Sequence, residues 1–239
     1  MSDHQILDSV AHRDLRVEPG ADAELGDGVM ACLAVPSEFR RLQNSFPILF
    51  RRDLERDVFS ALALMGFEQG ENLFLENGRW DAAYRPLALS IQPFLVGRPA
   101  SGDGPGQVHV DMGHARIARN GEGMRLFDDH GAQTPYLEVI AGQLGELDEG
   151  YRGSGAFFAA LQRYELLEPF SLDVELDDGS TQRMVGYHLI DEDKLRALDA
   201  AALGDLHAAG HLMPMFMALA SLSNIPALIA RKNRRIGRG

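Results

Sequence analysis

Cysteine is almost absent from this chain. Cys32 is the only cysteine among 239 residues, so no disulfide can form within the chain and no cysteine-rich zinc site exists. The residue lies in the apolar run Val29–Val35, where we expect a buried and inert thiol. Such cysteine usage suits a reducing compartment, and we expect a cytoplasmic protein.

Positive charge is also scarce. Lysine and arginine total 23 against 35 aspartates and glutamates, which gives a net charge of −12. A surface of this sign repels a phosphate backbone, so we expect no nucleic-acid partner. The chain has no P-loop, no G-x-S-x-G motif and no dinucleotide-binding fingerprint. We therefore predict no catalytic residue set, no bound metal and no cofactor.

Long apolar runs are missing, with one exception. Leu212–Ala230 contains no charged residue and is followed by the basic run Arg231–Arg235, as in a tail anchor. Two prolines and Ser223-Asn224 interrupt the run, so we predict two short core helices divided near Ser223-Asn224 and no membrane span. The N-terminus lacks the apolar segment of a secretory signal, and none is expected.

The first half of the chain shows short apolar runs separated by proline and glycine turns, a pattern typical of strands. A brief helix capped by Ser37 and ending at Asn44 interrupts them, and Gly97–Gly106 is the clearest loop. We predict a bent or barrel-like sheet. The expected strands are His12–Val17, Val29–Val35, Phe46–Phe50, Phe59–Gly66, Phe94–Val96 and Gln107–Met112.

The second half combines helical periodicity with one hairpin. Apolar spacing predicts separate helices over Tyr136–Glu149 and Ser154–Leu167, the second stopped by Pro169. Alternation on both sides of Asp177–Ser180 predicts a hairpin over residues 172–189. Helices should follow Asp191, over Asp199–Ala209 and His211–Ser221 and finally over Ile225–Arg235.

These patterns predict the α+β class. We divide the chain into a mainly β region, residues 1–112, and a helical region with the hairpin, residues 113–239. One continuous domain over both regions is the alternative.

The stretch Gly70–Phe94 concentrates the unusual residues, including Trp80, the only tryptophan. Asn77-Gly78 tolerates the positive φ of a tight turn, which predicts a hairpin between Asn72–Glu76 and Arg79–Asp81. Pro86 suits the first turn of a short helix, Pro86–Ile91.

The same stretch is our candidate binding site. Tryptophan and tyrosine often fill a core, and that alternative stays open for Trp80. Here, however, polar and charged side chains alternate with the aromatic ones, and Trp, Tyr and Arg are the common anchors of binding surfaces. The predicted binding residues are Asn72, Arg79, Trp80, Tyr84 and Arg85.

This chain resembles the SapC-like family of bacterial proteins. The resemblance extends from about His12 to Leu228. It rests on the order and spacing of several short motifs, none of them distinctive alone. They are GENLFL…GRWD…YRP…PF over Gly70–Phe94, His12–Leu15 with Pro19-Gly20, Phe46–Phe50, Leu126–Asp128, Leu166–Pro169, and Asp191-Glu192 with Lys194-Leu195.

The resemblance implies little about activity. The family name refers to a suggested role in secretion of surface-layer proteins. Members are often labelled peptide-transport permeases, a label that the single apolar run of this chain contradicts. They tend to be encoded near flavin-dependent halogenase-like and cupin-like oxygenase genes, which implies a shared pathway. No catalytic residues are known to us for the family.

Histidines supply the main alternative. On a strand, His109 and Asp111 point to one face and resemble two ligands of non-haem iron, with His130 or His188 as a third. A metal-dependent oxygenase-like enzyme using His109 and Asp111 is therefore the alternative function. His207 and His211 have helical metal spacing, but Gly210 should end the helix between them.

The sequence thus predicts a non-catalytic accessory protein that binds a protein or peptide partner. The family resemblance implies that this partner is a flavin-dependent halogenase-like or cupin-like enzyme, or surface-protein secretion machinery. The basic run Arg231–Arg238 offers an electrostatic contact to an acidic partner. Dipole stabilisation of a helix C-terminus explains the same charges.

Overall fold

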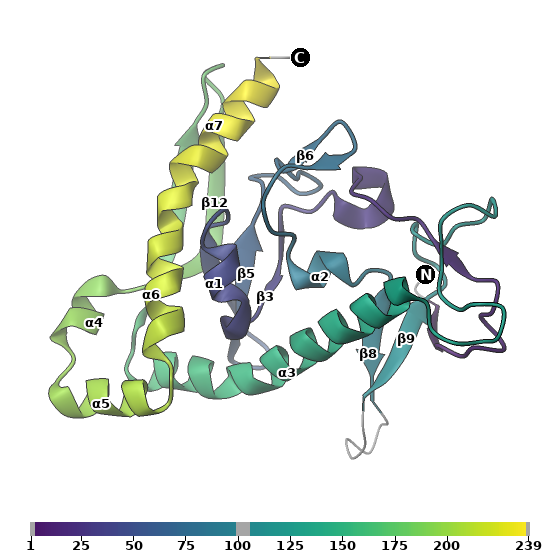
Figure 1. Ribbon diagram of the computed structural model, residues 1–239. Coiled ribbons are helices and arrows are strands. Elements are labelled where there is room, and N and C mark those ends of the chain that lie inside the picture. The colour runs from purple at the N-terminus through teal and green to yellow at the C-terminus, as the bar shows by residue number, and fades with distance from the viewer. Residues whose placement is uncertain (1–2, 99–105, 238–239) are drawn as a thin grey trace. The chain divides into compact units, whose positions relative to one another are not determined.

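The computed structural model describes residues 3–98 and 106–237 and combines helices with several antiparallel sheets (Figure 1). The α+β prediction is confirmed. Most of the predicted loop Gly97–Gly106 lies outside the described residues. Two compact units share the chain. The first holds Met1–Gly28, Leu75–Asp81 and Leu87–Glu149, and the second holds Val29–Phe74, Ala82–Pro86 and Gly150–Gly239. The expected division at residue 112 stays a prediction.

The first unit contains one three-stranded sheet in the order β1-β9-β8 and two short strand pairs. The sheet consists of β1 (His4–Ile6), β8 (Phe94–Gly97) and β9 (Gln107–Asp111). The pairs are β2 (Arg16–Val17) with β10 (Met124–Arg125), and β6 (Leu75–Glu76) with β7 (Arg79–Trp80). The predicted strand His12–Val17 is therefore reduced to its last two residues.

Apolar residues from two segments of the first unit, Met1–Gly28 and Leu87–Glu149, form its core. The predicted helix Pro86–Ile91 appears as α2 (Leu87–Ser90), and the irregular turn η1 (Ala23–Asp27) belongs to the same unit. Side chains of α3 (Pro135–Arg163) at the predicted helical spacing also enter the core. The core residues are Val17, Ile91, Phe94, Val110, Ile117, Leu126, Phe127, Leu137, Ile140 and Leu144.

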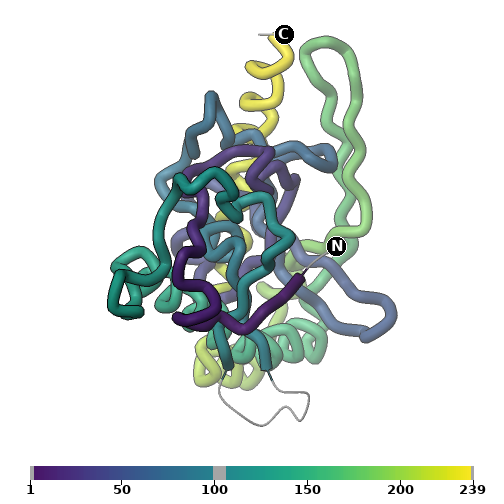
Figure 2. Tube along the Cα trace, turned by 90° about the vertical axis from the view of Figure 1, so that its right-hand side faces the viewer, coloured from purple at the N-terminus to yellow at the C-terminus, as the bar shows by residue number. Residues whose placement is uncertain are grey.

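The second unit contains a five-stranded antiparallel sheet in the order β11-β12-β4-β5-β3. The predicted hairpin around Asp177–Ser180 is confirmed and forms a long two-stranded ribbon (Figure 2). No sheet in the described part of the chain closes into a barrel. The strands are β3 (Ala31–Ala34), β4 (Ile48–Asp53), β5 (Val58–Leu64), β11 (Leu167–Glu175) and β12 (Thr181–Ile190).

Most helices of the second unit match their predicted ranges. Asp191 and Asp199 cap their helices by accepting hydrogen bonds from the backbone N–H groups of Lys194 and Ala202. Ser37 is not a cap, because it lies inside η2. The helices are η2 (Pro36–Glu38), α1 (Phe39–Leu42), α4 (Glu192–Ala197), α5 (Ala200–Ala208), α6 (Leu212–Ser221), η3 (Leu222–Asn224) and α7 (Ile225–Ile236).

One helix, α3 (Pro135–Arg163), replaces the two helices predicted between Tyr136 and Leu167. The predicted break between Glu149 and Ser154 was wrong, because Gly150 and Gly153 lie inside the continuous helix. A Cβ atom at Gly150 would lie 2.7 Å from Ser37 Oγ, so the glycine is needed for close packing. Pro169 does not stop the helix but lies in the edge strand β11, where a missing N–H is tolerated.

Candidate functional site

The hairpin β6–β7 presents two of the five predicted binding residues. Asn77 and Gly78 have φ angles of 52° and 70°, as the predicted tight turn requires. Strand pairing places Trp80 opposite Leu75 and Arg79 opposite Glu76. The Arg79 side chain is exposed and that of Trp80 is half-buried, so the tryptophan is neither a fully buried core residue nor a fully exposed one.

Asn72 belongs to the second unit and is buried. Its Oδ1 accepts a hydrogen bond from the Phe74 N–H at 3.0 Å, a local turn that sets the chain direction. Its Nδ2 lies 3.7 Å from the Met65 sulfur. The side chain is therefore engaged inside the protein, and no solvent-facing group of Asn72 is offered to a partner.

Tyr84 joins a buried carboxylate in the second unit. Its hydroxyl donates to Glu38 Oε1 at 2.7 Å, and the Glu38 side chain is fully buried. The Arg41 guanidinium lies 4.8 Å from the centre of the Tyr84 ring, within cation–π distance. These contacts give Tyr84 a structural role beside any contact with a partner.

Arg85 differs from Arg79 in its surroundings. It is half-buried, and its Nε atom is shielded from solvent. The five predicted residues are thus distributed over both units, with Arg79 and Trp80 in the first and Asn72, Tyr84 and Arg85 in the second. Arg79 and Trp80 are the pair most available to a partner, since one is exposed and the other half-buried.

Cys32 is buried, as predicted. Burial, and then the negative charge of Glu38, raise the pKa of its thiol above the ordinary value. A protonated thiol is a poor nucleophile and a poor metal ligand. The prediction that Cys32 is buried is confirmed, and the raised pKa agrees with the expectation of an inert thiol.

The C-terminal basic run is largely used within the second unit. Lys232 Nζ lies 2.8 Å from Glu68 Oε1 and 2.7 Å from Glu71 Oε1. The guanidinium of Arg231 lies 4.4 Å from the centre of the Phe74 ring, and Arg235 donates to the Asn72 carbonyl at 3.1 Å. These contacts fasten α7 to the segment Glu68–Phe74.

Burial would lower the pKa of Lys232, but its hydrogen bonds to Glu68 and Glu71 outweigh this effect and raise the pKa. The ammonium group is therefore charged at neutral pH and held by two carboxylates. Arg234, by contrast, is exposed on the same helix. Only a part of the basic run is thus accessible to an acidic partner.

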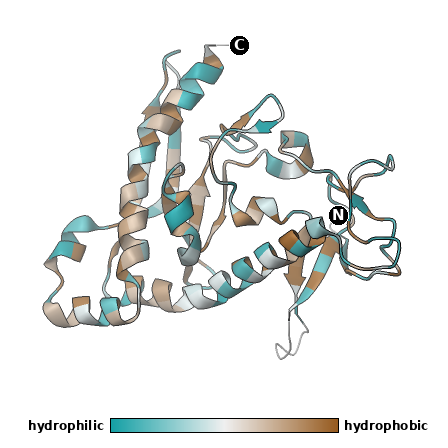
Figure 3. Ribbon diagram, in the orientation of Figure 1, coloured by the Kyte–Doolittle hydropathy of each residue, from teal (hydrophilic) through white to brown (hydrophobic). Residues whose placement is uncertain are grey.

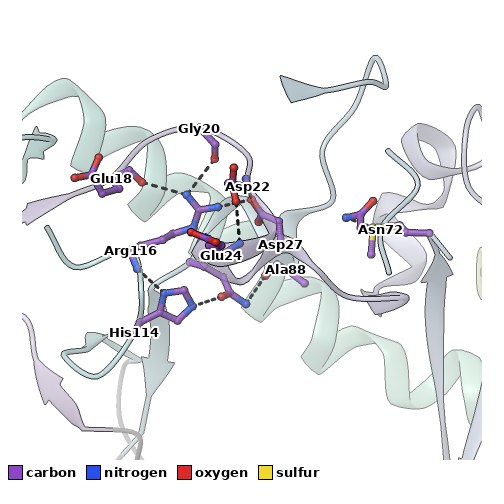
Figure 4. Close-up of polar contacts among 11 residues, drawn as sticks. Glu18, Gly20, Asp22, Glu24, Asp27, Asn72, Ala88, His114 and Arg116 are labelled. Atoms are coloured by element: carbon purple, nitrogen blue, oxygen red, sulfur yellow. Dashed lines mark hydrogen bonds and ion pairs between the residues drawn. The ribbon is translucent and has the colours of Figure 1, made fainter. Parts of the chain in front are cut away.

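Arg116 and Asp27 form the most buried ion pair described in the first unit (Figure 4). Arg116 Nη1 also donates to the carbonyls of Glu18 at 3.1 Å and Gly20 at 3.0 Å. Asp27 Oδ2 accepts the Asp22 N–H at 3.0 Å. One guanidinium therefore ties down the loop that contains η1.

His114 lies beside this ion pair (Figure 4). The Arg116 N–H donates to its Nδ1 at 3.1 Å, so Nε2 carries the proton and donates to Gln92 Oε1 at 2.5 Å. Burial and then the positive charge of Arg116 lower the pKa of His114. Both ring nitrogens are occupied by internal contacts, so this neutral histidine is structural and is not poised as a general base.

His109 and Asp111 lie on β9, but each has a local role. The His109 ring packs over Gly97 on the neighbouring strand β8, where a Cβ atom would collide with it. Asp111 Oδ1 accepts hydrogen bonds from the N–H groups of Asp3 and Gly113, both at 2.9 Å. These backbone hydrogen bonds lower the pKa of Asp111. Its carboxylate is thus already used as a turn-forming group.

Gly210, with a φ of 73°, follows Ala209, the C-cap of α5, and separates His207 from His211, as predicted. His130 lies in a turn and His188 packs edge-on against Phe59. Within residues 3–98 and 106–237, no three side chains of His, Cys, Asp or Glu are grouped closely enough to hold a metal ion.

The sequence interpretation missed the buried polar residues. Arg116 and Asp27 are 89 positions apart, and Lys232 is 161 positions from Glu71. The sequence contained only a weak indication that these two side chains are buried. Arg116 directly precedes the apolar Ile117, and Lys232 lies on the buried face of the amphipathic helix α7. Neither pattern identifies the partner carboxylate.

Comparison with known proteins gives one match. The family described as SapC matches residues 7–228, nearly the whole chain. No curated protein and no solved structure matches the chain.

Proposed function

The chain belongs to the SapC family, and we propose that it is a non-catalytic accessory protein that binds a protein or peptide partner. The observation that carries the proposal is the pairing of an exposed Arg79 with a half-buried Trp80 on the β6–β7 hairpin. An arginine beside a partly accessible tryptophan is typical of the few residues that dominate binding energy at an interface. The tight Asn77-Gly78 turn holds both on a short, ordered element.

The polar clusters support a binding role over a catalytic one. His114 has both ring nitrogens engaged, and Asp111 accepts two backbone hydrogen bonds. A general base or nucleophile needs a lone pair directed at a substrate. These two groups instead hold loops in place.

The pathway part of the proposal rests on the family resemblance. We propose a cytoplasmic protein that assists an oxidative tailoring enzyme, either a flavin-dependent halogenase-like or a cupin-like oxygenase, or assists surface-protein secretion. The negative net charge of −12 favours a partner with a basic surface and disfavours nucleic acid. No membrane span is part of this proposal.

The test is a titration of the full chain against each purified candidate enzyme. Arg79→Ala should fold normally and weaken binding by a factor of about 10 or more, since a hot-spot residue contributes at least ~1–2 kcal/mol. Trp80→Ala should weaken binding further. It should also cost stability, by less than the roughly 3–5 kcal/mol typical of a fully buried tryptophan, because Trp80 is only partly buried.

Arg119→Ala is the matched control, because Arg119 is an exposed arginine of the same unit outside the hairpin. Equal affinity of wild type, Arg79→Ala and Arg119→Ala for a partner that does bind would remove the hairpin from the interface. Absence of binding to both enzyme classes would remove the proposed role beside an oxidative tailoring enzyme and leave secretion as the remaining pathway.

A further inference from the structure

The outermost strand of the five-stranded sheet leaves one of its edges open. β11 (Leu167–Glu175) pairs with β12 on one side only, in the sheet order β11-β12-β4-β5-β3. On the other side, no group in the described part of the chain hydrogen-bonds to its backbone. Unpaired N–H and C=O groups along a strand are a template for one further strand.

Hydrogen bonds at its two ends show which backbone groups of β11 face outward. The Leu176 N–H donates to the Ser180 carbonyl at 2.9 Å, and the Asp191 N–H donates to the Leu166 carbonyl at 2.9 Å. Hydrogen-bonded positions alternate along an antiparallel ladder, so the even-numbered residues bond to β12. The odd-numbered residues direct their backbone groups outward, and they are Leu167, Pro169, Ser171, Asp173 and Glu175.

The usable part of this edge is Ser171–Glu175. The bulge between Phe170 and Leu172 lies in β12, at Val185-Gly186, and leaves β11 itself regular. Before this segment, Pro169 has no N–H to offer to a further strand, which ends main-chain pairing at that point.

The two faces of this segment differ in chemistry. Ser171, Asp173 and Glu175 are exposed on one face, whereas Leu172 is half-buried and Val174 is buried on the other. Figure 3 shows hydrophilic and hydrophobic residues along the β11–β12 ribbon, which lies behind α7 in that view. A strand added to this edge therefore needs polar residues for one face and apolar residues for the other, in alternation.

Charge defines the polar residues of the added strand. Glu175 makes no ion pair with any described residue, and Asp173 Oδ1 lies 3.5 Å from Arg183 Nε in a pair whose side chains are 63% and 69% exposed. Such an exposed contact is weak and leaves most of the negative potential in place. The adjoining turn adds the exposed Asp177 and Asp178. Lysine or arginine opposite Asp173 and Glu175 is therefore favoured.

The same charges exclude a second copy of β11. Full antiparallel pairing of the segment with itself would put Ser171 opposite Glu175 and Asp173 opposite the Asp173 of the other copy. Like charges directly opposite each other on neighbouring strands are destabilising. A partner strand with basic residues avoids this repulsion, and its pairing should be antiparallel, as every pairing in this sheet is.

We propose that the Ser171–Glu175 edge of β11 binds an extended segment of a partner protein, in which basic and apolar residues alternate, as an additional antiparallel strand. The edge belongs to the second unit, whereas the β6–β7 hairpin belongs to the first. The proposal goes beyond the role assigned to the hairpin, and its test uses neither Arg79 nor Trp80. Failure of one proposal therefore leaves the other standing.

The probe is a short peptide of alternating lysine and valine, added to the isotope-labelled full chain, and the readout is the hydrogen-exchange rate of single amides by NMR. Binding should slow the exchange of the Ser171, Asp173 and Glu175 N–H groups at least about tenfold, because they face solvent in the free protein. The Val174 N–H faces β12 and is the internal control, with a much smaller change.

Two N-methylated peptides of equal charge separate main-chain pairing from charge attraction. In antiparallel pairing, the peptide residues that bond to β11 have their side chains on the same face as Asp173 and Glu175, and these residues are the lysines. N-methylation of the lysines removes the N–H groups directed at β11 and should weaken binding about tenfold or more. N-methylation of the valines removes the N–H groups directed away from β11 and should weaken binding much less.

Charge reversal on the protein tests the acidic face. The double variant Asp173→Lys, Glu175→Lys should bind the lysine–valine peptide about tenfold or more weakly, because like charges then face each other. Glu55→Lys, a charge reversal at an exposed position of the same unit, is the matched control and should keep wild-type affinity. Both variants should retain the circular dichroism of the wild type.

Unchanged exchange at Ser171, Asp173 and Glu175 on addition of the peptide would overturn the proposal. Equal affinity of the two N-methylated peptides would do the same, because it would leave charge attraction alone as the cause of binding. Slow exchange of the same amides without peptide, increasing with protein concentration, would assign the edge to a second copy of the chain instead.

Discussion

Arg116 donates a hydrogen bond from Nη2 to Asp27 Oδ2 at 2.6 Å, in a pair whose side chains are 3% and 1% exposed. Taking two charges out of water is unfavourable, and it is offset here by further hydrogen bonds to Glu18, Gly20 and Asp22. The pair therefore holds the loop that contains η1 in place within the first unit.

Removal of one member of this pair should be strongly destabilising. Asp27→Ala leaves a buried guanidinium without its counter-charge, and we expect a loss of about 3–5 kcal/mol in the free energy of unfolding, measured in urea. Arg119→Ala, the exposed control, should change it by less than about 0.5 kcal/mol. Similar small effects of both variants would show that the pair does not hold the loop.

Lys232 predicts a specific dependence of stability on pH. Its pKa is raised above 10.5 in the folded protein, so the folded state binds this proton more tightly than the unfolded chain does. The resulting stability is fully present below pH 10.5 and is lost as the pH rises through the folded pKa.

We therefore expect the stability difference between wild type and Lys232→Met to be constant from about pH 7 to pH 9.5 and to shrink above that range. Arg234→Met, a cation change at an exposed site on the same helix, should show no such pH dependence. A difference that stays constant up to about pH 11.5 would contradict the assigned contacts of Lys232.

Two glycines of α3 should respond in opposite directions to alanine. A Cβ atom at Gly142 meets nothing within 4 Å, so Gly142→Ala should stabilise the helix by about 1 kcal/mol. At Gly150 the same atom would lie 2.7 Å from Ser37 Oγ and from Val35 Cγ2. Gly150→Ala should therefore cost about 1–3 kcal/mol. The measurement is the thermal unfolding temperature of each variant relative to wild type. Stabilisation by both substitutions would contradict the close packing at Gly150.

Local features of this fold were predictable from the sequence, because their causes lie within a few residues. Asn77-Gly78 specifies its own turn, and Asp191 and Asp199 cap helices that begin directly after them. The apolar spacing of Leu137, Ile140 and Leu144 identified the buried face of α3.

Features that depend on distant partners were not predictable. The continuity of α3 through Gly150 depends on Val35 and Ser37, more than a hundred residues earlier. For the candidate site, the sequence identified Trp80 and Arg79 by composition. It did not reveal that Asn72 is buried or that Tyr84 is bound to Glu38. Those contacts form only when separate segments fold together.

The metal alternative has its own test. Protein purified without an affinity tag or chelator should carry no stoichiometric iron or zinc, because the Asp111 carboxylate is engaged by backbone N–H groups and the His109 ring packs over Gly97. Elemental analysis is the measurement. About one metal per chain, lost in His109→Ala but retained in His207→Ala, a change at an exposed histidine outside the proposed ligand set, would support the oxygenase-like alternative.

Site-specific photo-crosslinking in the native host tests the central claim most directly, that a protein partner binds at the β6–β7 hairpin. A photoreactive amino acid replaces Arg79 in one variant and Arg119 in the other, both exposed positions of the first unit. The account predicts one dominant crosslinked protein from position 79, identified by mass spectrometry as a halogenase-like or cupin-like enzyme or a secretion component, and little or none from position 119. Equal labelling at both positions, or no crosslink at position 79 in cells that express both proteins, would contradict it.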